Sequence, residues 1–230
     1  MDISAFLNPL FSASNPVLPN ASVMAVALVV LWAVVLGSGT LLLAGKLARP
    51  YRLGLALLVI VLTLVPGESS PAYWLGLSFQ TPSLMSGLIC LAWALGRLRQ
   101  DTGHIAPVLV EQPKALRILS LLGVVLGWVL LLDTLAWFPV SIYAWGFSAA
   151  AVLLLLVMLA ALVWLLSGNW GANLICLGVL ALFVLTRLPT GNVWDALIDP
   201  WLWVALQAGW LVSAARRLRA WRRSTPATRV

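Results

Sequence analysis

Charged, histidine and cysteine side chains are all scarce in this chain of 230 residues. Asp, Glu, Lys and Arg make up only 9% of it, whereas a soluble domain uses about a quarter charged residues to cover its surface. The one histidine, His104, cannot supply both axial ligands of a haem or form a histidine-rich metal site. The two cysteines, Cys90 and Cys176, do not form a C-x-x-C pair. These shortages exclude the common protein-bound metal and haem centres.

Short catalytic motifs are missing as well. The sequence has no glycine-rich phosphate loop, no serine nucleophile elbow and no HExxH pair of metal-binding histidines. We therefore expect no cofactor and no bound metal, and an enzyme ranks last among the functions considered.

Apolar residues dominate what remains. They make up 62% of the chain, and the mean hydropathy is +1.02. A soluble core cannot hide so much apolar surface, so lipid is the expected solvent. Isolated apolar segments in lipid must satisfy their own backbone hydrogen bonds, and residues 150–166 are continuously apolar rather than alternating. The sequence thus predicts an all-α fold, a polytopic integral membrane bundle of about seven transmembrane helices.

Basic residues give the bundle an orientation. All but one of the 14 Lys and Arg residues lie in alternate gaps between the apolar stretches, and Arg187 is the exception. Because such residues stay on the cytoplasmic side during insertion, the N-terminus is expected outside and the C-terminus inside, with Arg187 at the outer boundary. The net charge of +7 is explained in this way, so we expect no nucleic-acid partner. The predicted location is a bacterial inner membrane.

The expected organisation is an exported tail (1–21), a transmembrane bundle (22–215) and a basic cytoplasmic tail (216–230). Within residues 68–82, aromatic and polar side chains interrupt the apolar pattern. This segment either lies at the outer interface before a short span or belongs to one long span kinked at Pro82, and the first alternative is favoured. Six or eight spans remain open. The predicted spans are 22–45, 51–66, 83–96, 118–138, 142–166, 172–188 and 201–215, with 190–200 as a polar outer loop.

Four acidic residues are expected at or near the outer side, together with the lone outer cation. Asp133 lies roughly 24 Å beyond Arg117 along a helix, so it is either a buried site for cation or proton handling or a residue that reaches the headgroups. Asp195 and Asp199 are four residues apart and share a face if they are helical. An acidic outer vestibule and an ordinary solvated loop are both open. The candidate polar or ion site comprises Asp133, Asp195, Asp199, Glu68 and Arg187.

The basic C-terminal segment has the character of a helix on an anionic leaflet, where each cation adds about 1 kcal/mol of attraction. Membrane lipids and other integral membrane proteins are therefore the expected partners. Gly123 and Gly127 have the small-residue spacing that lets another helix approach closely. The predicted anionic-lipid contacts are Arg216, Arg217, Arg219, Arg222 and Arg223.

Three functions follow in order of preference. The first is a non-catalytic subunit or assembly component of a larger membrane complex, because the loops are short and few ionisable groups lie in the spans. The second is a small transporter or channel component whose polar path near Asp133 is formed by Gln80, Thr81, Ser83, Ser86, Asp133 and Gln207. The third is an enzyme acting on a lipid-linked or quinone-like substrate at the outer interface.

Overall fold

The computed structural model describes residues 12, 16–99, 114–165 and 170–224. Within these residues the chain forms ten helices and no strand, which confirms the all-α prediction. The helices are α2 (Ala21–Leu43), α3 (Arg49–Leu64), α4 (Pro71–Phe79), α5 (Leu84–Arg99), α6 (Lys114–Thr134), α7 (Ile142–Trp145), α8 (Ala149–Leu165), α9 (Trp170–Thr186), α10 (Val193–Leu197) and α11 (Pro200–Ser224).

Several helices begin at a side chain that accepts a hydrogen bond from the first turn. Asn20 accepts from the backbone N–H of Ser22 at 2.9 Å at the start of α2, and Ser70 caps α4, which has Pro71 in its first turn. Such caps satisfy backbone donors that have no partner inside the helix. The polar residues between the apolar runs therefore decide where the helices start.

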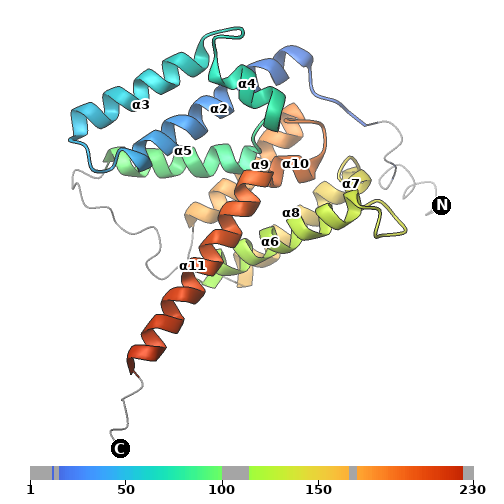
Figure 1. The fold of residues 1–230 in the computed structure, drawn as a ribbon. Helices are drawn as coiled ribbons and strands as arrows, with labels where there is room; N and C mark the ends of the chain where they lie inside the picture. Colours follow the sequence, from blue (N-terminus) through green and yellow to red (C-terminus); the bar gives the residue numbers. More distant parts are fainter. Residues whose placement is uncertain (1–11, 13–15, 100–113, 166–169, 225–230) are drawn as a thin grey trace, which may run out of the picture.

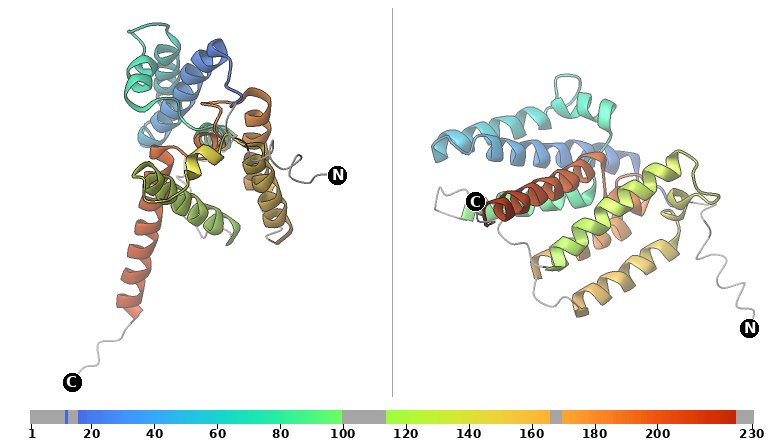
Figure 2. Two further views of the ribbon diagram at one scale, coloured as in Figure 1. Left: turned by 90° about the vertical axis from the view of Figure 1, so that its right-hand side faces the viewer. Right: turned by 60° about the horizontal axis from the view of Figure 1, so that its bottom comes forward.

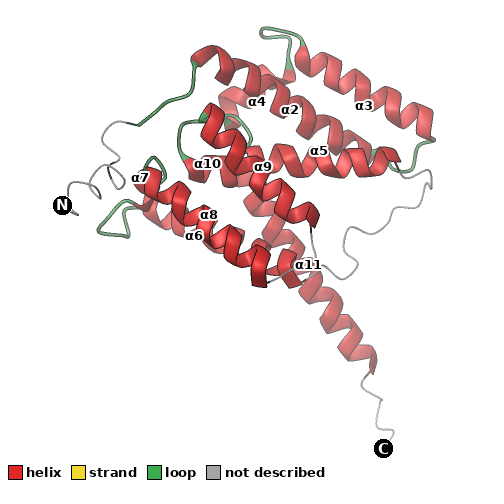
Figure 3. Cartoon of the chain, turned by 180° about the vertical axis from the view of Figure 1, so that it is seen from behind, coloured by secondary structure: helices red, strands yellow, loops and turns green. Residues whose placement is uncertain are grey.

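The helix ends are sorted into two opposite ends of the bundle. Helices α4, α7 and α10 lie toward one end, which we call the cap end (Figures 1 and 3). The connection between α2 and α3 and the C-terminal ends of α5 and α11 lie toward the other, the basic end (Figure 2). The basic end carries Lys46, Arg49, Arg97 and Arg216 from three separate gaps of the sequence. Gaps of the sequence that are rich in basic residues therefore lie at the same end of the bundle.

Close helix contacts rest on glycines. Helix α2 packs against α3, α4 and α5, and α5 packs in turn on α9. A Cβ at Gly87 of α5 would lie 2.4 Å from the Leu31 side chain of α2. On α6, a Cβ at Gly127 would lie 2.2 Å from the Trp203 ring of α11. The glycine spacing of α6 therefore serves a contact within this chain.

The buried core lies mainly between α9, α10 and the N-terminal parts of α5 and α8. Val179 and Phe183 of α9 are fully buried and belong to one cluster with Leu84, Val152 and Trp194. Polar side chains are buried too, and they are Ser38, Thr63, Ser70, Ser83, Ser86, Ser148, Asn192 and Asp199. Many large apolar side chains instead face outward.

Two expectations about the helices are wrong. Residues 142–166 do not form one helix, because the chain leaves the helix after α7 and restarts at α8, where the Ser148 hydroxyl accepts a hydrogen bond from Ala151. Residues 190–200 are not an ordinary solvated loop, since they contain α10 and bury Val193 and Ala196. The segment 68–82 contains the separate helix α4, with Gln80 at a φ of 62° ending it, so a single kinked span is excluded.

Helix length and composition give a smaller number of clear spans than the sequence pattern. Two helical segments, Ala21–Leu43 and Leu116–Thr134, are long and apolar enough to cross a bilayer. Three shorter apolar segments are Leu84–Leu98, Ala149–Ala161 and Gly171–Thr186. The count of seven spans is not confirmed and stays a prediction.

Helix α11 continues without a break from the apolar segment into the basic one.

Candidate functional site

Asp133 lies at the C-terminal end of α6 and holds the start of α7. Its carboxylate accepts hydrogen bonds from the backbone N–H groups of Ile142 at 3.0 Å and Tyr143 at 2.7 Å. It also accepts one from the hydroxyl of Ser141 at 3.1 Å. A carboxylate favours the N-terminal end of a helix because the unpaired N–H groups there carry partial positive charge. Asp133 therefore fixes the turn between α6 and α7.

Asp195 meets the same segment from α10. Its carboxylate accepts hydrogen bonds from the phenol of Tyr143 at 2.7 Å and from the hydroxyl of Thr190. Burial raises the pKa of Tyr143 above its ordinary value, and the hydrogen bond and negative charge of Asp195 raise it further. Asp133 and Asp195 thus contact opposite ends of Tyr143. We call Asp133, Tyr143, Thr190, Asn192 and Asp195 the Tyr143 cluster.

Asn192 ties α10 to α7 in the middle of this cluster. The side chain is fully buried and donates to the carbonyl of Tyr143 at 2.8 Å, while its oxygen accepts from the N–H of Trp194 at 3.0 Å. The indole of Trp194 donates to the carbonyl of Ile142 at 3.0 Å. A Cβ at Gly146 would lie 1.8 Å from the Asn192 oxygen. This approach requires glycine after α7, and the carbonyl of Gly146 accepts a hydrogen bond from the N–H of Val193 at 3.0 Å instead of one from the next helical turn.

Asp199 joins the beginnings of two helices that are far apart in the sequence. Its carboxylate accepts from the N–H of Ser83 at 2.8 Å and from the hydroxyl of Ser86 at the start of α5. It also accepts from the N–H of Leu202 at 2.8 Å in the first turn of α11. Asp199 is buried, so these bonds satisfy a charge that burial would otherwise make costly. One carboxylate thus caps both α5 and α11.

Glu68 and Arg187 do not share these interactions. Glu68 is exposed between α3 and α4, where its backbone carbonyl accepts from the Trp74 indole at 2.8 Å. The guanidinium of Arg187 lies 5.4 Å from the centre of the Phe183 ring, and its φ is 58°. The structure therefore brings Asp133 and Asp195 together at Tyr143, while Asp199 has separate partners and Glu68 and Arg187 stand apart.

The residues proposed for a polar path have separate partners as well. Ser83 and Ser86 are bonded to Asp199. The amide of Gln207 donates to the Trp203 carbonyl one turn earlier on α11, at 3.4 Å. The carbonyl of Gln80 accepts from the buried indole of Trp32 at 2.9 Å. These contacts hold helices in position and do not line one shared passage.

The basic segment extends from the bundle as the last turns of α11. Arg216, Arg217 and Arg219 are exposed there. The side chains of Arg222 and Arg223 and all of His104 lie outside the described residues.

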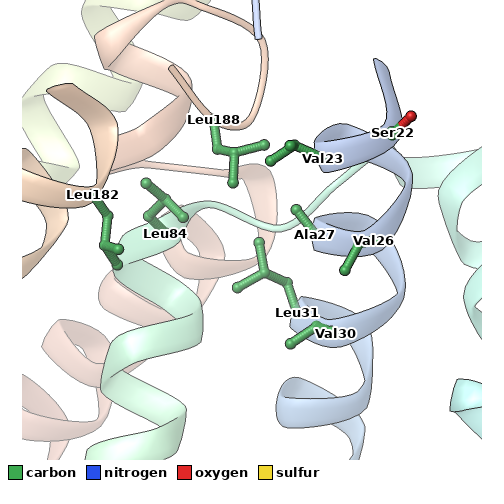
Figure 4. A pocket seen from close by; sticks show the side chains of 9 residues that line it. All are labelled: Ser22, Val23, Val26, Ala27, Val30, Leu31, Leu84, Leu182 and Leu188. Carbon is green, nitrogen blue, oxygen red and sulfur yellow. The ribbon is translucent and has the colours of Figure 1, made fainter. Parts of the chain in front are cut away.

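An apolar groove opens on the side of the bundle (Figure 4). Its volume is about 440 Å³. It lies between the first half of α2, the start of α5, the end of α9 and the residue after Arg187. The lining side chains are Ser22, Val23, Val26, Ala27, Val30, Leu31, Leu84, Leu182 and Leu188. This groove was not expected from the sequence, because its walls come from three distant parts of the chain.

Comparison with known proteins adds no assignment. No protein-family model matches the chain, and neither a curated protein nor a solved structure is significantly similar to it.

The chemistry of the polar clusters is that of fold stabilisation. Across the described residues, every buried side-chain nitrogen or oxygen has a hydrogen-bond partner, and no three His, Cys, Asp or Glu side chains gather as metal ligands. The Asp195 carboxylate and the Asp199 carboxylate are each committed to two or more donors. Tyr143 and Asn192 were not among the residues expected from the sequence. Ser83 and Ser86 were expected in a polar path and instead form a helix cap, for which Ser83-x-x-Ser86 has the usual spacing.

Proposed function

We propose that this chain is a multi-pass protein of an inner membrane and a non-catalytic subunit or scaffold of a larger membrane complex. In this proposal α2, α3, α5, α6, α8, α9 and α11 are the seven spans. The cap end faces outside and the basic end faces the cytoplasm. The observation that carries it is the large number of big apolar side chains that face outward around the bundle, while the buried polar side chains are hydrogen-bonded within it.

The outward apolar side chains are the strongest support for immersion in lipid. Leu57 of α3, Val157 of α8 and Leu211 of α11 are 62%, 66% and 71% exposed. They belong to helices from both halves of the chain. A soluble monomer rarely leaves such extended apolar surface in water, whereas hydrocarbon solvates it without cost.

The gathering of basic residues at one end supports the orientation. Lys46, Arg49, Arg97 and Arg216 lie at helix ends that share the basic end. Cations retained on the cytoplasmic side would be placed in this way. The 16-residue helices α3 and α5 rise about 24 Å, and their basic ends can reach water across a core of about 30 Å because long side chains extend to the interface.

The commitment of the carboxylates supports a non-catalytic role. Asp133, Asp195 and Asp199 each accept hydrogen bonds that hold helix ends in place. A general acid or base, or an ion-binding carboxylate, needs a lone pair directed at its substrate or ion. The transporter and enzyme alternatives have less support for this reason.

Orientation is tested with reporters fused to the two termini. We expect an alkaline phosphatase fusion to be active at the N-terminus and a fluorescent protein fusion to be bright at the C-terminus, and we expect the protein to resist extraction at alkaline pH. Termini on the same side, or release of the protein by alkaline wash, would contradict the proposal.

The subunit role is tested by purification from native membranes in mild detergent. We expect a defined membrane protein partner at fixed stoichiometry, lost when an exposed apolar face such as that around Leu211 is substituted. A monomer that transports or turns over a substrate by itself would overturn this role.

A further inference from the structure

The apolar groove has the dimensions of one membrane leaflet. It follows α2 from Ser22 to Leu31, nine residue steps, which is about 13.5 Å of helical rise. A bilayer core of about 30 Å contains two leaflets, so this length matches the depth of one. In the proposed orientation Ser22 is at the outer surface and Leu31 near the midplane.

The two ends of the groove differ. Figure 4 shows Ser22, Val23 and Leu188 gathered at one end, with Val30 and Leu31 at the other. Ser22 is the one polar residue among the nine that line the groove. The groove is thus lined only by apolar side chains at its inner end and has a polar residue at its outer end. This arrangement fits a molecule with a long apolar tail and a polar head.

A basic residue adjoins the polar end of the groove in the chain. Arg187 directly precedes the lining residue Leu188, and it is the one Lys or Arg of the whole sequence outside the basic gaps. Arg187 is half-buried, with its guanidinium over the Phe183 ring. Guanidinium groups bind phosphate oxygens with good geometry. A phosphate group bound there would account for the position of this one basic residue outside the basic gaps.

We propose that this groove binds one acyl chain of an anionic phospholipid from the outer leaflet, with the lipid phosphate at Arg187. The inference rests on the proposed membrane location. The occupant is a lipid rather than a helix of a partner protein, because the depth of the groove matches one leaflet and the basic residue next to the lining residue Leu188 complements a phosphate.

The test uses the purified full-length protein in nanodiscs that contain a phospholipid with a photoreactive diazirine on its acyl chain. One preparation carries the probe on phosphatidylglycerol and the other on phosphatidylcholine. After irradiation, we expect labelled peptides at residues 22–31 and around Leu182, with phosphatidylglycerol labelling them about fivefold more than phosphatidylcholine, as one cation near a charged headgroup allows.

Two variants and a control locate the site. Ala27→Trp fills the groove and is expected to abolish labelling there. Arg187→Gln leaves the groove open and is expected to remove the preference for phosphatidylglycerol. Leu57→Trp, on the exposed face of α3, is the matched control and should leave groove labelling unchanged. The circular dichroism and thermal unfolding of all variants are compared, and Arg187→Gln keeps the test valid if Ala27→Trp does not fold.

The outcomes separate this inference from the membrane proposal. Labels on α3 and α6 without labels in the groove would overturn the lipid site and leave the membrane location standing. Absence of labels everywhere, with a protein that alkaline wash releases, would overturn the membrane location. Equal labelling by the two lipids would overturn the role of Arg187 and hence the proposal. Crosslinks in native membranes from Val26 to a copurifying protein would also overturn it.

Discussion

Single carboxylates connect segments that are distant in the sequence. The Asp199 carboxylate accepts hydrogen bonds from residues at the starts of α5 and α11. The Asp195 carboxylate accepts one from Tyr143, and α8 and α9 lie between these two residues in the sequence. Each is a short side chain whose position depends on the fold. Their removal should therefore weaken the whole bundle rather than one loop.

Replacing Asp199 by alanine should lower the free energy of unfolding by about 3 kcal/mol, because the buried donors of Ser83 and Ser86 lose their acceptor. Unfolding in mixed detergent micelles, followed by tryptophan fluorescence, measures this change. Glu68→Ala is the matched control on an exposed carboxylate and should change the value by less than about 0.5 kcal/mol. Equal effects of the two substitutions would contradict the capping role of Asp199.

Replacing Tyr143 by phenylalanine should cost about 2 kcal/mol at neutral pH, because a hydrogen bond to a charged acceptor is lost. The pKa of Tyr143 is raised above its ordinary value of 10, so the folded chain keeps this proton when the unfolded chain has lost it. The contribution is complete below pH 10 and declines as the pH rises further.

The measurement is the unfolding free energy of the wild type and of Tyr143→Phe between about pH 8 and about pH 11, a range that spans the ordinary pKa of tyrosine. The difference between the two proteins should shrink at the alkaline end. A difference that grows with pH would show that the phenol is not held in its protonated form.

At the level of helices, α6 approaches α11 closely at two glycines, Gly123 and Gly127. Gly127→Ala should destabilise the pair by about 1–3 kcal/mol, because the added Cβ would meet the ring of Trp203. Gly209→Ala on α11 is the control, since nothing lies within 4 Å of its added Cβ, and it should be neutral or slightly stabilising. Unfolding free energies and the Trp203 emission maximum report both effects.

The sequence was sufficient for most long helices. The apolar runs that become α2, α6 and α9 differ from their predicted ranges mainly at the ends, because hydrophobicity and basic flanks are local signals. The interruption between α7 and α8 was not expected, since there the Gly146 carbonyl accepts from the N–H of Val193, a residue far along the chain. Apolar composition alone does not distinguish a continuous helix from two that meet at a glycine.

The acidic residues show the same limit. Their partners were not available from the sequence, because Asp199 reaches back 116 positions to Ser83 and Asp195 reaches 52 to Tyr143. The pattern of charges indicates where a residue lies along its helix, but not which helices are neighbours. The hypothesis of an acidic outer vestibule could therefore not be decided from the sequence.

For the whole molecule, the chain divides into two groups of helices. Helices α2 to α5 form one group, and α6 to α11 form the other, with contacts of α5 to α9 and α10 between them (Figure 1). The Asp199 bonds to Ser83 and Ser86 cross this division. Each group therefore contains polar atoms that only the other group can satisfy.

This division makes the protein suitable for fragment complementation. Residues 1–106 and 107–230, produced as two polypeptides in one cell, should associate without a covalent link, because the contacts of α5 with α9 and α10 hold the two groups together. Asp199→Ala in the second fragment should reduce recovery of the first on an affinity resin, whereas Glu68→Ala in the first should not. A gene encoding this chain could thus be divided in two and still yield the same assembly.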